Sequence, residues 1–466
     1  MESKYNSRMR KFVKFLAIPM LAALVVIPAS LSSFASDQEN SQSDDVLNQL
    51  VANNSGDRNA MGDSHMDSRV CPPAAPGEAT CIAIERNYFK RGVKIEQNAA
   101  NATPSAATPN LTLVGFNSAK LRSAYGITEL GSPATVIAIV DAYGYPSALT
   151  DLNTYRANYG VGVDPVAMTS CTNTNNKPTF PASATRGCFA QISGVTGLTT
   201  NLPKSNTGWN QEGALDIEMA TAICPKCSIL FVAANSASFA DLNKAVGQAN
   251  SYVNVVAISN SYGGADFAST GLAPAVDNYH AAALRGVAVT ASSGDSGYGA
   301  QSPASFTNVI GVGGTSLTLN PNVTRNSEII WTLAGSGCST QNPIPTQPSS
   351  TTTGCSKKVV SDISAVANPN TGVGVIYGGK VYQFGGTSVS SPIIASIFAV
   401  AGYTPVQNAY AGALLYRNAN VTNIFDVVVP GKNGNCPAAT AKWCTTGTGW
   451  DGPTGLGAPL NTGAFH

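Results

Sequence analysis

The sequence predicts an α/β fold in which a mainly parallel sheet is covered by helices on both faces. Short, continuous runs of Val, Ile and Ala recur between residues 135 and 312, and such runs indicate strands that are buried on both sides. Segments with helical spacing of apolar residues alternate with these runs. The chain has 466 residues, of which 43% are apolar and 45 are Gly, enough for one large, loop-rich domain with appended segments.

The first expected strand covers residues 135–140, and a helix over residues 148–159 follows it. Further strands are expected at residues 228–233, 253–259, 286–291 and 308–312, and helices at residues 239–252 and 274–284. In a parallel sheet of this kind, active groups gather at the carboxyl ends of the strands.

The first 35 residues have the pattern of a secretory signal peptide. Basic residues precede an apolar run over residues 15–27, and small residues before Ser36 mark the expected cleavage point. A permanent membrane anchor is the alternative, but Pro19 and Pro28 interrupt the run, which is shorter than the roughly 20 residues that a span needs. We therefore expect a secreted protein without stable membrane association after cleavage.

Residues 36–109, called the leader below, are polar and rich in Asn, Ser, Ala and Pro. Only the part from Cys81 to Val93 has a sustained apolar pattern, so we expect a short propeptide or flexible leader that ends in a linker over residues 98–110. The main domain is expected to span residues 110–466. The net charge is +1 and charged residues are 11% of the chain without runs, which argues against nucleic acid or a lipid surface as a partner.

The ten cysteines fall into five pairs of sequence neighbours, and in an exported protein such pairs predict disulfides. The pairs are Cys71 and Cys81, Cys171 and Cys188, Cys224 and Cys227, Cys338 and Cys355, and Cys436 and Cys444. A redox or zinc site at Cys224 and Cys227 is the alternative. It is disfavoured because no second Cys-x-x-Cys exists and the chain has only three His.

The strongest local motif is Gly-Gly-Thr-Ser-Val-Ser-Ser-Pro at residues 385–392, which leads into an apolar helix. Its glycines allow a peptide to approach the backbone, and a serine at a helix start lies beside free N–H groups, so Ser388 is a candidate nucleophile. Its own N–H can face the oxyanion that forms during attack. A second Gly-Gly-Thr-Ser ends at Ser316, but a strand pattern follows it, and we interpret Ser316 as structural.

A serine nucleophile needs a base, and His is the usual one. His65 lies in the leader, His466 ends the chain, and His280 lies within a helical pattern, so a His-dependent triad has little support. Glu212 and Asp216 are four residues apart in a helical pattern, which puts both on one face.

Two carboxyls held together share a proton, because both do not ionise easily. The alternative for Glu212 and Asp216 is a solvated helix face, and Glu218 points away from Glu212.

Asp295 lies in Ser-Gly-Asp-Ser-Gly, directly after an expected strand. A protonated aspartic acid at this position can donate to an oxyanion, and the alternative is an ordinary turn.

Together these residues resemble the sedolisins, the serine-carboxyl peptidases related to subtilisin. Glu-x-x-x-Asp at residues 212–216, Ser-Gly-Asp-Ser-Gly at residues 293–297 and Gly-Thr-Ser-x-x-x-Pro at residues 386–392 occur in the family's order and approximate spacing. The resemblance covers the chain from about Gly115 to its end. It implies a subtilisin-like fold and a secreted serine-type endopeptidase that is most active in acid.

The resemblance also implies a role for each residue. Ser388 attacks the peptide carbonyl, Glu212 takes its proton and returns it to the leaving amine, Asp216 orients Glu212, and protonated Asp295 helps to bind the oxyanion. Residues 259–263, Ser-Asn-Ser-Tyr-Gly, resemble the family's substrate-binding edge, where an extended peptide pairs with the backbone. We therefore expect polypeptide substrates and a monomeric enzyme.

The same resemblance implies one structural Ca²⁺ ion near the end of the chain. Its carboxylate ligands would be Asp426 and Asp451, and its carbonyl ligands Val427, Gly447 and Gly449. Such a set of hard oxygen ligands suits Ca²⁺.

Two features depart from the family pattern. The leader is shorter than the usual folded prosegment, and the five cysteine pairs are more than expected. Asp141, at the end of the first strand, is interpreted as structural or as a modest tuning charge. A catalytically inactive binding protein on a peptidase scaffold is the rival hypothesis, although no catalytic residue is missing. A conventional subtilisin is disfavoured because no His-Gly-Thr segment is present.

Overall fold

The computed structural model describes residues 63–90, 93–94, 96–98, 114–160, 162–181, 185–272, 277–345 and 350–466. The expected signal peptide, the first part of the leader and nearly all of the expected linker lie outside these residues. Within them, no helix combines the length and apolarity needed to cross a bilayer.

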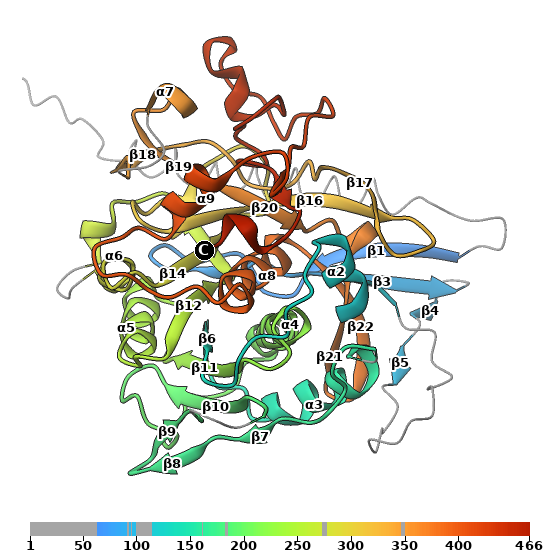
Figure 1. Cartoon of the computed structure of the whole chain (residues 1–466), viewed down its shortest axis with the longest axis vertical. Coiled ribbons are helices and arrows are strands. Elements are labelled where there is room, and N and C mark those ends of the chain that lie inside the picture. The colour runs from blue at the N-terminus through green and yellow to red at the C-terminus, as the bar shows by residue number, and fades with distance from the viewer. Residues whose placement is uncertain are drawn as a thin grey trace, which may run out of the picture. The chain divides into compact units, whose positions relative to one another are not determined.

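A nine-stranded sheet forms the centre of the fold, in the order β17-β16-β14-β12-β6-β11-β10-β7 with β20 beside β16 (Figure 1). Neighbouring strands are parallel, except that β17 runs antiparallel to β16. The strands are β6 (Val136–Ala142), β7 (Thr169–Ser170), β10 (Cys188–Ser193), β11 (Ser228–Ala234), β12 (Val255–Asn260), β14 (Ala288–Ser292), β16 (Ile310–Leu319), β17 (Arg325–Ile330) and β20 (Ile363–Val366). The predicted mainly parallel sheet is confirmed.

Two apolar cores lie on opposite faces of this sheet, and β6 contributes to both. Ile137 and Ile139 belong to the first core, whereas Val136, Ala138 and Val140 belong to the second. Successive side chains of a strand point to opposite faces, and both faces of β6 are covered by a core. Every position of β6 is therefore buried.

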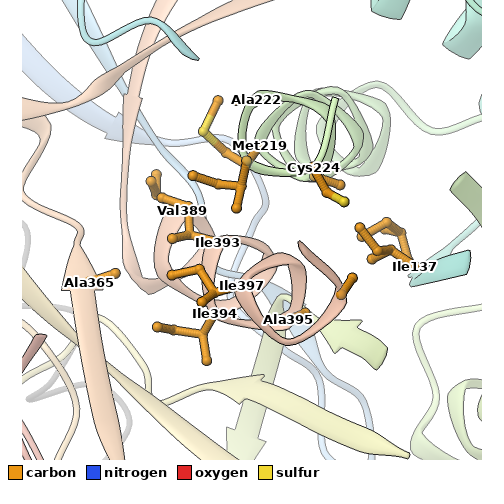
Figure 2. Packing of buried hydrophobic residues seen from close by; sticks show 14 of the residues in the cluster. Ile137, Met219, Ala222, Cys224, Ala365, Val389, Ile393, Ile394, Ala395 and Ile397 are labelled. Atoms are coloured by element: carbon orange, nitrogen blue, oxygen red, sulfur yellow. The ribbon is translucent and has the colours of Figure 1, made fainter. Parts of the chain in front are cut away.

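Helices cover both cores, as predicted. The first core contains residues of α2 (Ser118–Ala124), α3 (Ala148–Tyr159), α4 (Thr207–Ile223) and α8 (Thr387–Val400). The second contains residues of α5 (Phe239–Asn250) and α6 (Asn278–Leu284). In Figure 2, Met219 of α4 lies near Val389 and Ile393 of α8 in one cluster. The helix that carries Ser388 is therefore packed directly against the helix that carries the two acids.

Most predicted elements begin and end within two residues of their expected positions. Helix α3 has the predicted bounds, and α5 ends two residues before the expected end at residue 252. Helix α6 begins at Asn278 because Asp277 caps it, accepting a hydrogen bond from the N–H of His280. The strand expected at residues 308–312 continues as β16 to Leu319, so Ser316 lies within a strand and accepts a hydrogen bond from Asn368.

Part of the leader is folded onto the rest of the chain. Strands β1 (Asp63–Arg69) and β3 (Ile84–Lys90) form an antiparallel sheet with β22 (Lys380–Gly385) and β21 (Val373–Tyr377), joined by β4 (Val93–Lys94) and β5 (Gln97–Asn98). Strand β2 (Thr80–Cys81) pairs with β13 (Tyr262–Ala265), which also pairs with β15 (Gln301–Ser302). The leader therefore contributes ordered strands, an outcome that its polar composition does not suggest.

All five expected cysteine pairs form disulfides. Two of them lie at small peripheral elements, one at the hairpin of β18 (Cys338–Pro343) and β19 (Lys357–Val359) and one in the C-terminal segment. The remaining strands and α-helices are β8 (Thr172–Thr174), β9 (Lys177–Thr179), α7 (Ser350–Thr353), α9 (Gly412–Asn418), β23 (Ile424–Phe425) and β24 (Ala458–Pro459).

Val246→Ala tests the second core. Val246 on α5 is 0% exposed, so removing two methyl groups should lower the free energy of unfolding by about 2 kcal/mol. The measurement is urea denaturation followed by circular dichroism. The same substitution at Val421, which is 88% exposed, should change stability by less than about 0.5 kcal/mol. Equal losses at both positions would contradict the assignment of Val246 to a packed core.

Candidate active site

Ser388 is the second residue of α8 and is fully buried. Gly386 precedes the helix with φ 98°, a conformation that glycine adopts without strain. The Ser388 hydroxyl donates to the carbonyl oxygen of Ser261 at 3.3 Å. Pro392 has no N–H to bond the Ser388 carbonyl oxygen, and the Ser261 hydroxyl donates to that oxygen instead, also at 3.3 Å. Two hydrogen bonds therefore join these two serines.

Glu212 and Asp216 lie one turn apart on α4, and both are 0% exposed. Their burial excludes the alternative of a solvated helix face. Oε2 of Glu212 accepts hydrogen bonds from the backbone N–H groups of Ile82 and Ala83, each at 2.9 Å. Both carboxyls are thus held inside the protein, where the charged form is costly.

Burial raises the pKa of Glu212 well above its usual value, and the negative charge of Asp141 raises it further. The neighbouring Ser388 hydroxyl and the Ala83 N–H oppose these effects and lower the pKa. The Ser388 hydroxyl itself donates to Ser261, and Oε1 of Glu212 has no hydrogen-bond partner among the described residues. Burial likewise raises the pKa of Asp216 well above its usual value, with further increases from the charges of Asp141 and Glu212. Protons are therefore retained within this group of acids.

Asp295 follows β14 and is 1% exposed. Its Oδ1 accepts hydrogen bonds from the N–H and the hydroxyl of Thr387, both at 2.8 Å. Its Oδ2 has no hydrogen-bond partner among the described residues and lies beside Gly386. Burial raises the pKa of Asp295 to about 7, so this carboxyl carries a proton in mild acid. The structure therefore brings all four predicted catalytic side chains to one place.

Asp141, interpreted from sequence as structural or as a modest tuning charge, belongs to this group of acids. It lies near the end of β6, is fully buried, and neither carboxylate oxygen has a hydrogen-bond partner among the described residues. Burial raises its pKa well above the usual value. The signal in the sequence was a single acid in an otherwise apolar strand.

Sequence reasoning missed the part of the leader that contacts the site. Besides Ile82 and Ala83, Arg69 approaches Asp295, since its guanidinium donates to the Ser296 hydroxyl at 3.0 Å. The positive charge of Arg69 lowers the pKa of Asp295, against the larger effect of burial. The apolar pattern from Cys81 onward was the available signal, but it does not say where the segment packs.

The two alternative candidates for the base, His280 and Glu218, have other hydrogen-bond partners. His280 on α6 is exposed, and its ring forms a hydrogen bond with the side chain of Asn308. Glu218 is buried, but its Oε2 accepts from the N–H of Ile376 on β21.

Four of the five predicted calcium ligands are joined in two pairs by hydrogen bonds near the end of the chain. Oδ2 of Asp426 accepts from the N–H of Gly449 at 2.8 Å, and Oδ2 of Asp451 accepts from the N–H of Gly447 at 3.0 Å. Burial raises the pKa of Asp451 to about 7, and the charge of Asp426 contributes to the increase. Oδ1 of Asp426 is buried without a partner among the described residues. In the same residues, no group of three or more His, Cys, Asp and Glu side chains could hold a metal ion.

The model of the subtilase family matches residues 193–426, which include Glu212, Asp216, Asp295 and Ser388. The chain belongs to the subtilase family. Kumamolisin from Bacillus sp. (strain MN-32) is 28% identical to this subtilase over 399 residues, or 79% of the chain. Sedolisin from Pseudomonas sp. (strain 101) is 26% identical over 403 residues, or 78% of the chain. The resemblance to the sedolisins is therefore confirmed.

This subtilase spans 64% of the length of each of these two relatives. A solved structure of Pseudomonas sedolisin, a serine-carboxyl proteinase complexed with two molecules of pseudo-iodotyrostatin, aligns with a TM-score of 0.59 at 22% identity. The alignment covers 75% of this chain and 96% of that one. The two proteins share the same fold, which confirms the predicted subtilisin-like fold.

The buried acids predict a subtilase that is more stable in acid than at neutral pH. The folded pKa of Asp295 is about 7, above that of an unfolded Asp, so the folded state holds the proton more tightly. Stability should be greatest below the unfolded pKa of about 4 and fall as the pH rises through about 7, by ~4 kcal/mol for Asp295 alone. Glu212 and Asp216 add to the same trend.

Urea denaturation between pH 4 and pH 8 measures this dependence. Asp295→Asn carries no titrating proton and should flatten the curve between pH 4 and pH 7. A free energy of unfolding that stays constant or rises over this range in the unmodified chain would contradict the expectation.

Proposed function

We propose that this protein is a secreted serine-carboxyl endopeptidase of the sedolisin type, which hydrolyses peptide bonds in acid through an acyl-enzyme on Ser388. The observation that carries the proposal is the convergence of one hydroxyl and three acids in one buried place. Ser388 comes from the start of α8, Glu212 and Asp216 from α4, and Asp295 from the turn after β14. No His takes part among the described residues, so a carboxylate has to serve as the base.

The reaction begins with attack of the Ser388 oxygen on the carbonyl carbon of an extended peptide. The hydroxyl proton passes to Glu212, which then transfers it to the amine nitrogen as the peptide bond breaks. Asp216 holds Glu212 in place and shares its proton. A water molecule then attacks the ester, gives a proton to Glu212 and releases the new carboxyl end, and Ser388 recovers its hydroxyl.

Negative charge develops on the carbonyl oxygen during each attack. The protonated carboxyl of Asp295 donates one hydrogen bond to it, and the backbone N–H of Ser388 donates another. Both hydrogen bonds of Thr387 to Oδ1 of Asp295 leave Oδ2 available for this purpose. Since the pKa of Asp295 is about 7, the donor is present in acid and is lost as the pH rises through that value.

The rival hypothesis of an inactive binding protein has weaker support. Burying a polar side chain costs free energy unless hydrogen bonds or an opposite charge compensate for it. An inactive scaffold would gain nothing from burying four such side chains together. The four residues are all present here, and each is at most 1% exposed.

The proposal includes one structural Ca²⁺ ion in the C-terminal segment. Asp426 and Asp451 are close enough for their charges to interact, and one buried carboxylate oxygen has no partner among the described residues. A hard cation would offset these charges, with the carbonyl oxygens of Val427, Gly447 and Gly449 as further ligands. Bound Ca²⁺ would fix the conformation of the segment.

The proposal includes the expected course of maturation. Residues 1–35 act as a signal peptide, residues 36–109 as a leader, and residues 110–466 as the peptidase domain. The five disulfides fit an oxidising compartment. The substrates are polypeptides, and the enzyme acts as a monomer without nucleic acid or membrane as partner.

Substitution of the proposed catalytic residues should remove activity without unfolding the chain. After removal of the leader and incubation at pH 4 with a denatured protein, peptides should appear with the otherwise unmodified chain, and their rate of release should fall about 10⁴-fold or more with Ser388→Ala or Glu212→Gln. Asp295→Ala should lose about 10²–10³-fold. Mass spectrometry of the peptides measures the rates, and activity should be lower at pH 8 than at pH 4.

Ser316→Ala is the matched control, because Ser316 ends the second Gly-Gly-Thr-Ser and lies in β16. It should leave the rate unchanged. Turnover near that of the unmodified chain in Ser388→Ala, or a maximum at alkaline pH, would refute the proposed mechanism.

Removal of Ca²⁺ should lower the melting temperature. A ligand at 100 times its Kd stabilises a folded chain by about 2.7 kcal/mol, so a chelator should lower the Tm by several degrees. Thermal unfolding with and without the chelator measures the shift, and Asp426→Asn should abolish it. Asp277→Asn, which replaces one good helix cap with another, should retain it. An unmodified chain whose Tm does not respond to Ca²⁺ would rule out the site.

A further inference from the structure

Asp295 lies on a loop, whereas the other three proposed catalytic residues lie on helices. Residues 293–299, called the Asp295 loop below, contain three glycines with positive φ, which is 110° at Gly294, 76° at Gly297 and 152° at Gly299. Glycine loses more conformational freedom on folding than any other residue, so this loop has little rigidity of its own. A hydrogen-bond donor stabilises an oxyanion best when it is held in place beforehand. The contacts that hold the Asp295 loop therefore bear on the proposed reaction.

One side of the Asp295 loop is held by residues 333–336. The N–H groups of Gly297 and Gly299 donate to carbonyl oxygens of this segment, each at 2.9 Å. The N–H of Gly335 donates in turn to the carbonyl oxygen of Gly294 at 2.6 Å. Residues 333–336 themselves lie outside the helices and strands, so this segment also needs support from elsewhere.

Asn433 joins the Asp295 loop to this segment. Its carbonyl oxygen accepts a hydrogen bond from the N–H of Tyr298 in the loop at 2.8 Å. Its side chain donates to the carbonyl oxygen of Ala334 at 2.6 Å and accepts from the hydroxyl of Ser336 at 3.1 Å. Asn433 is 5% exposed, so these hydrogen bonds are shielded from water. One residue thus binds the loop through its backbone and the supporting segment through its side chain.

The backbone around Asn433 and the Asp295 loop are packed without a gap. A Cβ on Gly297 would lie 2.4 Å from the carbonyl oxygen of Asn433. A Cβ on Gly434 would lie 2.6 Å from the Cβ of Tyr298. Neither position has room for a side chain, so a shift of Asn433 would be transmitted to the loop.

A disulfide holds Asn433 in turn. Residues 432–445, called the disulfide loop below, contain the bond between Cys436 and Cys444. The N–H of Asn433 donates to the carbonyl oxygen of Cys444 at 3.0 Å. A cysteine pair that the family resemblance did not explain is thereby connected to the proposed active site.

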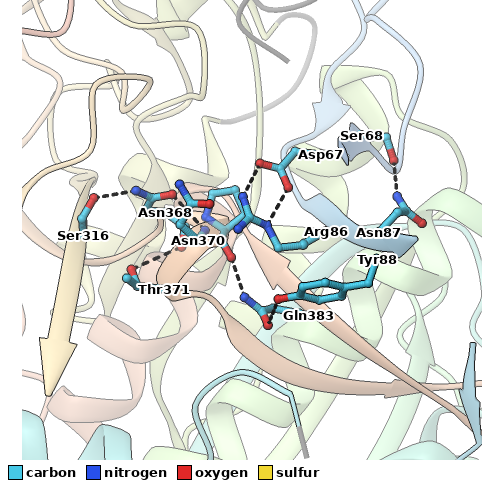
Figure 3. Close-up of polar contacts among 11 residues, drawn as sticks. Asp67, Ser68, Arg86, Asn87, Tyr88, Ser316, Asn368, Asn370, Thr371 and Gln383 are labelled. Atoms are coloured by element: carbon cyan, nitrogen blue, oxygen red, sulfur yellow. Dashed lines mark hydrogen bonds and ion pairs between the residues drawn. The ribbon is translucent and has the colours of Figure 1, made fainter. Parts of the chain in front are cut away.

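Side-chain amides hold the segment before the proposed nucleophile in a comparable way (Figure 3). Gln383 of β22 donates to the carbonyl oxygen of Pro369 at 2.7 Å, and Asn368 donates to the hydroxyl of Ser316 at 2.8 Å. A Cβ on Gly385 would lie 2.4 Å from the backbone nitrogen of Pro369. On this side, as beside Asp295, a side-chain amide fixes a glycine-containing segment against its neighbour.

We propose that Asn433 is a positioning residue of the proposed peptidase, which holds the Asp295 loop so that the carboxyl of Asp295 faces the oxyanion, and that the disulfide loop supports Asn433. This proposal rests on the proposed catalytic function and adds a residue that acts through Asp295. The oxyanion forms in the transition state and not in the bound substrate. Loss of Asn433 should therefore lower kcat and leave KM nearly unchanged.

A second effect is expected on the proton of Asp295. Burial raises its pKa to about 7, whereas the hydrogen bonds from Thr387 and the charge of Arg69 lower it, and the charge of Asp295 in turn raises the pKa of Glu212. A loosened loop admits water to the Asp295 carboxyl, and its pKa should then fall toward the usual value of about 4. Activity should consequently decline at a lower pH than in the chain that retains Asn433.

Kinetics of Asn433→Ala measure the effect on catalysis. After removal of the leader, and at pH 4 with a short fluorogenic peptide, kcat should fall at least about tenfold, less than with Asp295→Ala, while KM changes less than about twofold. Asn243→Ala is the matched control, since Asn243 on α5 is also buried and accepts a hydrogen bond from the N–H of Asn278 at 2.8 Å. It should leave kcat unchanged. A kcat that falls no further in Asn433→Ala than in Asn243→Ala would overturn the proposal.

The double variant Cys436→Ser, Cys444→Ser opens the disulfide loop and keeps Asn433. Its kcat should fall at least about threefold, again with little change in KM. The double variant Cys171→Ser, Cys188→Ser opens a disulfide at the amino end of β10 and should leave kcat unchanged. Equal kcat values in these two variants would refute the supporting role of the disulfide loop.

A measurement without catalysis separates the positioning role from the proposed function. In full-length chains labelled with ¹³C at the Asp carboxyl carbon, the NMR resonance of Asp295 is the one that Asp295→Asn removes. Its pKa should be lower by about one unit or more in Asn433→Ala and unchanged in Asn243→Ala. The same pKa in all these chains would contradict the positioning role. If the shift is found but no chain hydrolyses peptides, the role of Asn433 stands and the proposed catalytic function fails.

Discussion

The arrangement depends on one electrostatic constraint, the burial of several carboxyl groups in one place without a basic partner that would neutralise them all. Burial raises the pKa values of Asp141, Glu212 and Asp216, the charge of Asp141 raises those of Glu212 and Asp216 further, and the charge of Glu212 adds to that of Asp216. Such a group is tolerated only if it retains protons. In the proposed mechanism, the same retention supplies Ser388 with a base that can also act as an acid, in place of His. We therefore expect both the activity and the stability of the chain to depend on acid.

The fold meets this constraint by bringing together the ends of several rigid elements. Asp141 lies near the carboxyl end of β6, Asp295 follows the carboxyl end of β14, and Ser388 opens α8. The first core fixes α4 against α8, so that packing of apolar side chains sets the distance between the acids and the nucleophile. Hydrogen bonds then set the orientation of the side chains. Thr387, which directly precedes Ser388, orients the carboxyl of Asp295 through two of them.

Much of this could be predicted from sequence because the relevant signals are local. Continuous apolar runs predicted the parallel sheet, and the spacing of Glu212 and Asp216 placed them on one helix face. The strand pattern after the second Gly-Gly-Thr-Ser correctly set Ser316 apart from Ser388. The place of Asp141 beside Asp216 was not predictable, because it depends on which helix covers β6. The packing of the leader was not predictable either, since β2 and β3 pair with strands about 180 and 300 positions further along the chain.

The two hydrogen bonds between Ser261 and Ser388 hold the proposed nucleophile in a fixed position relative to the proposed peptide-binding strand. Ser261 directly precedes β13, the proposed peptide-binding edge, and its carbonyl oxygen accepts the hydrogen bond from the hydroxyl of Ser388, the proposed nucleophile. Because Pro392 frees the partner carbonyl for this bond, edge and nucleophile cannot slide past each other by one residue without breaking both links. The proposed cleavage position is therefore fixed relative to the register in which a peptide would pair with β13.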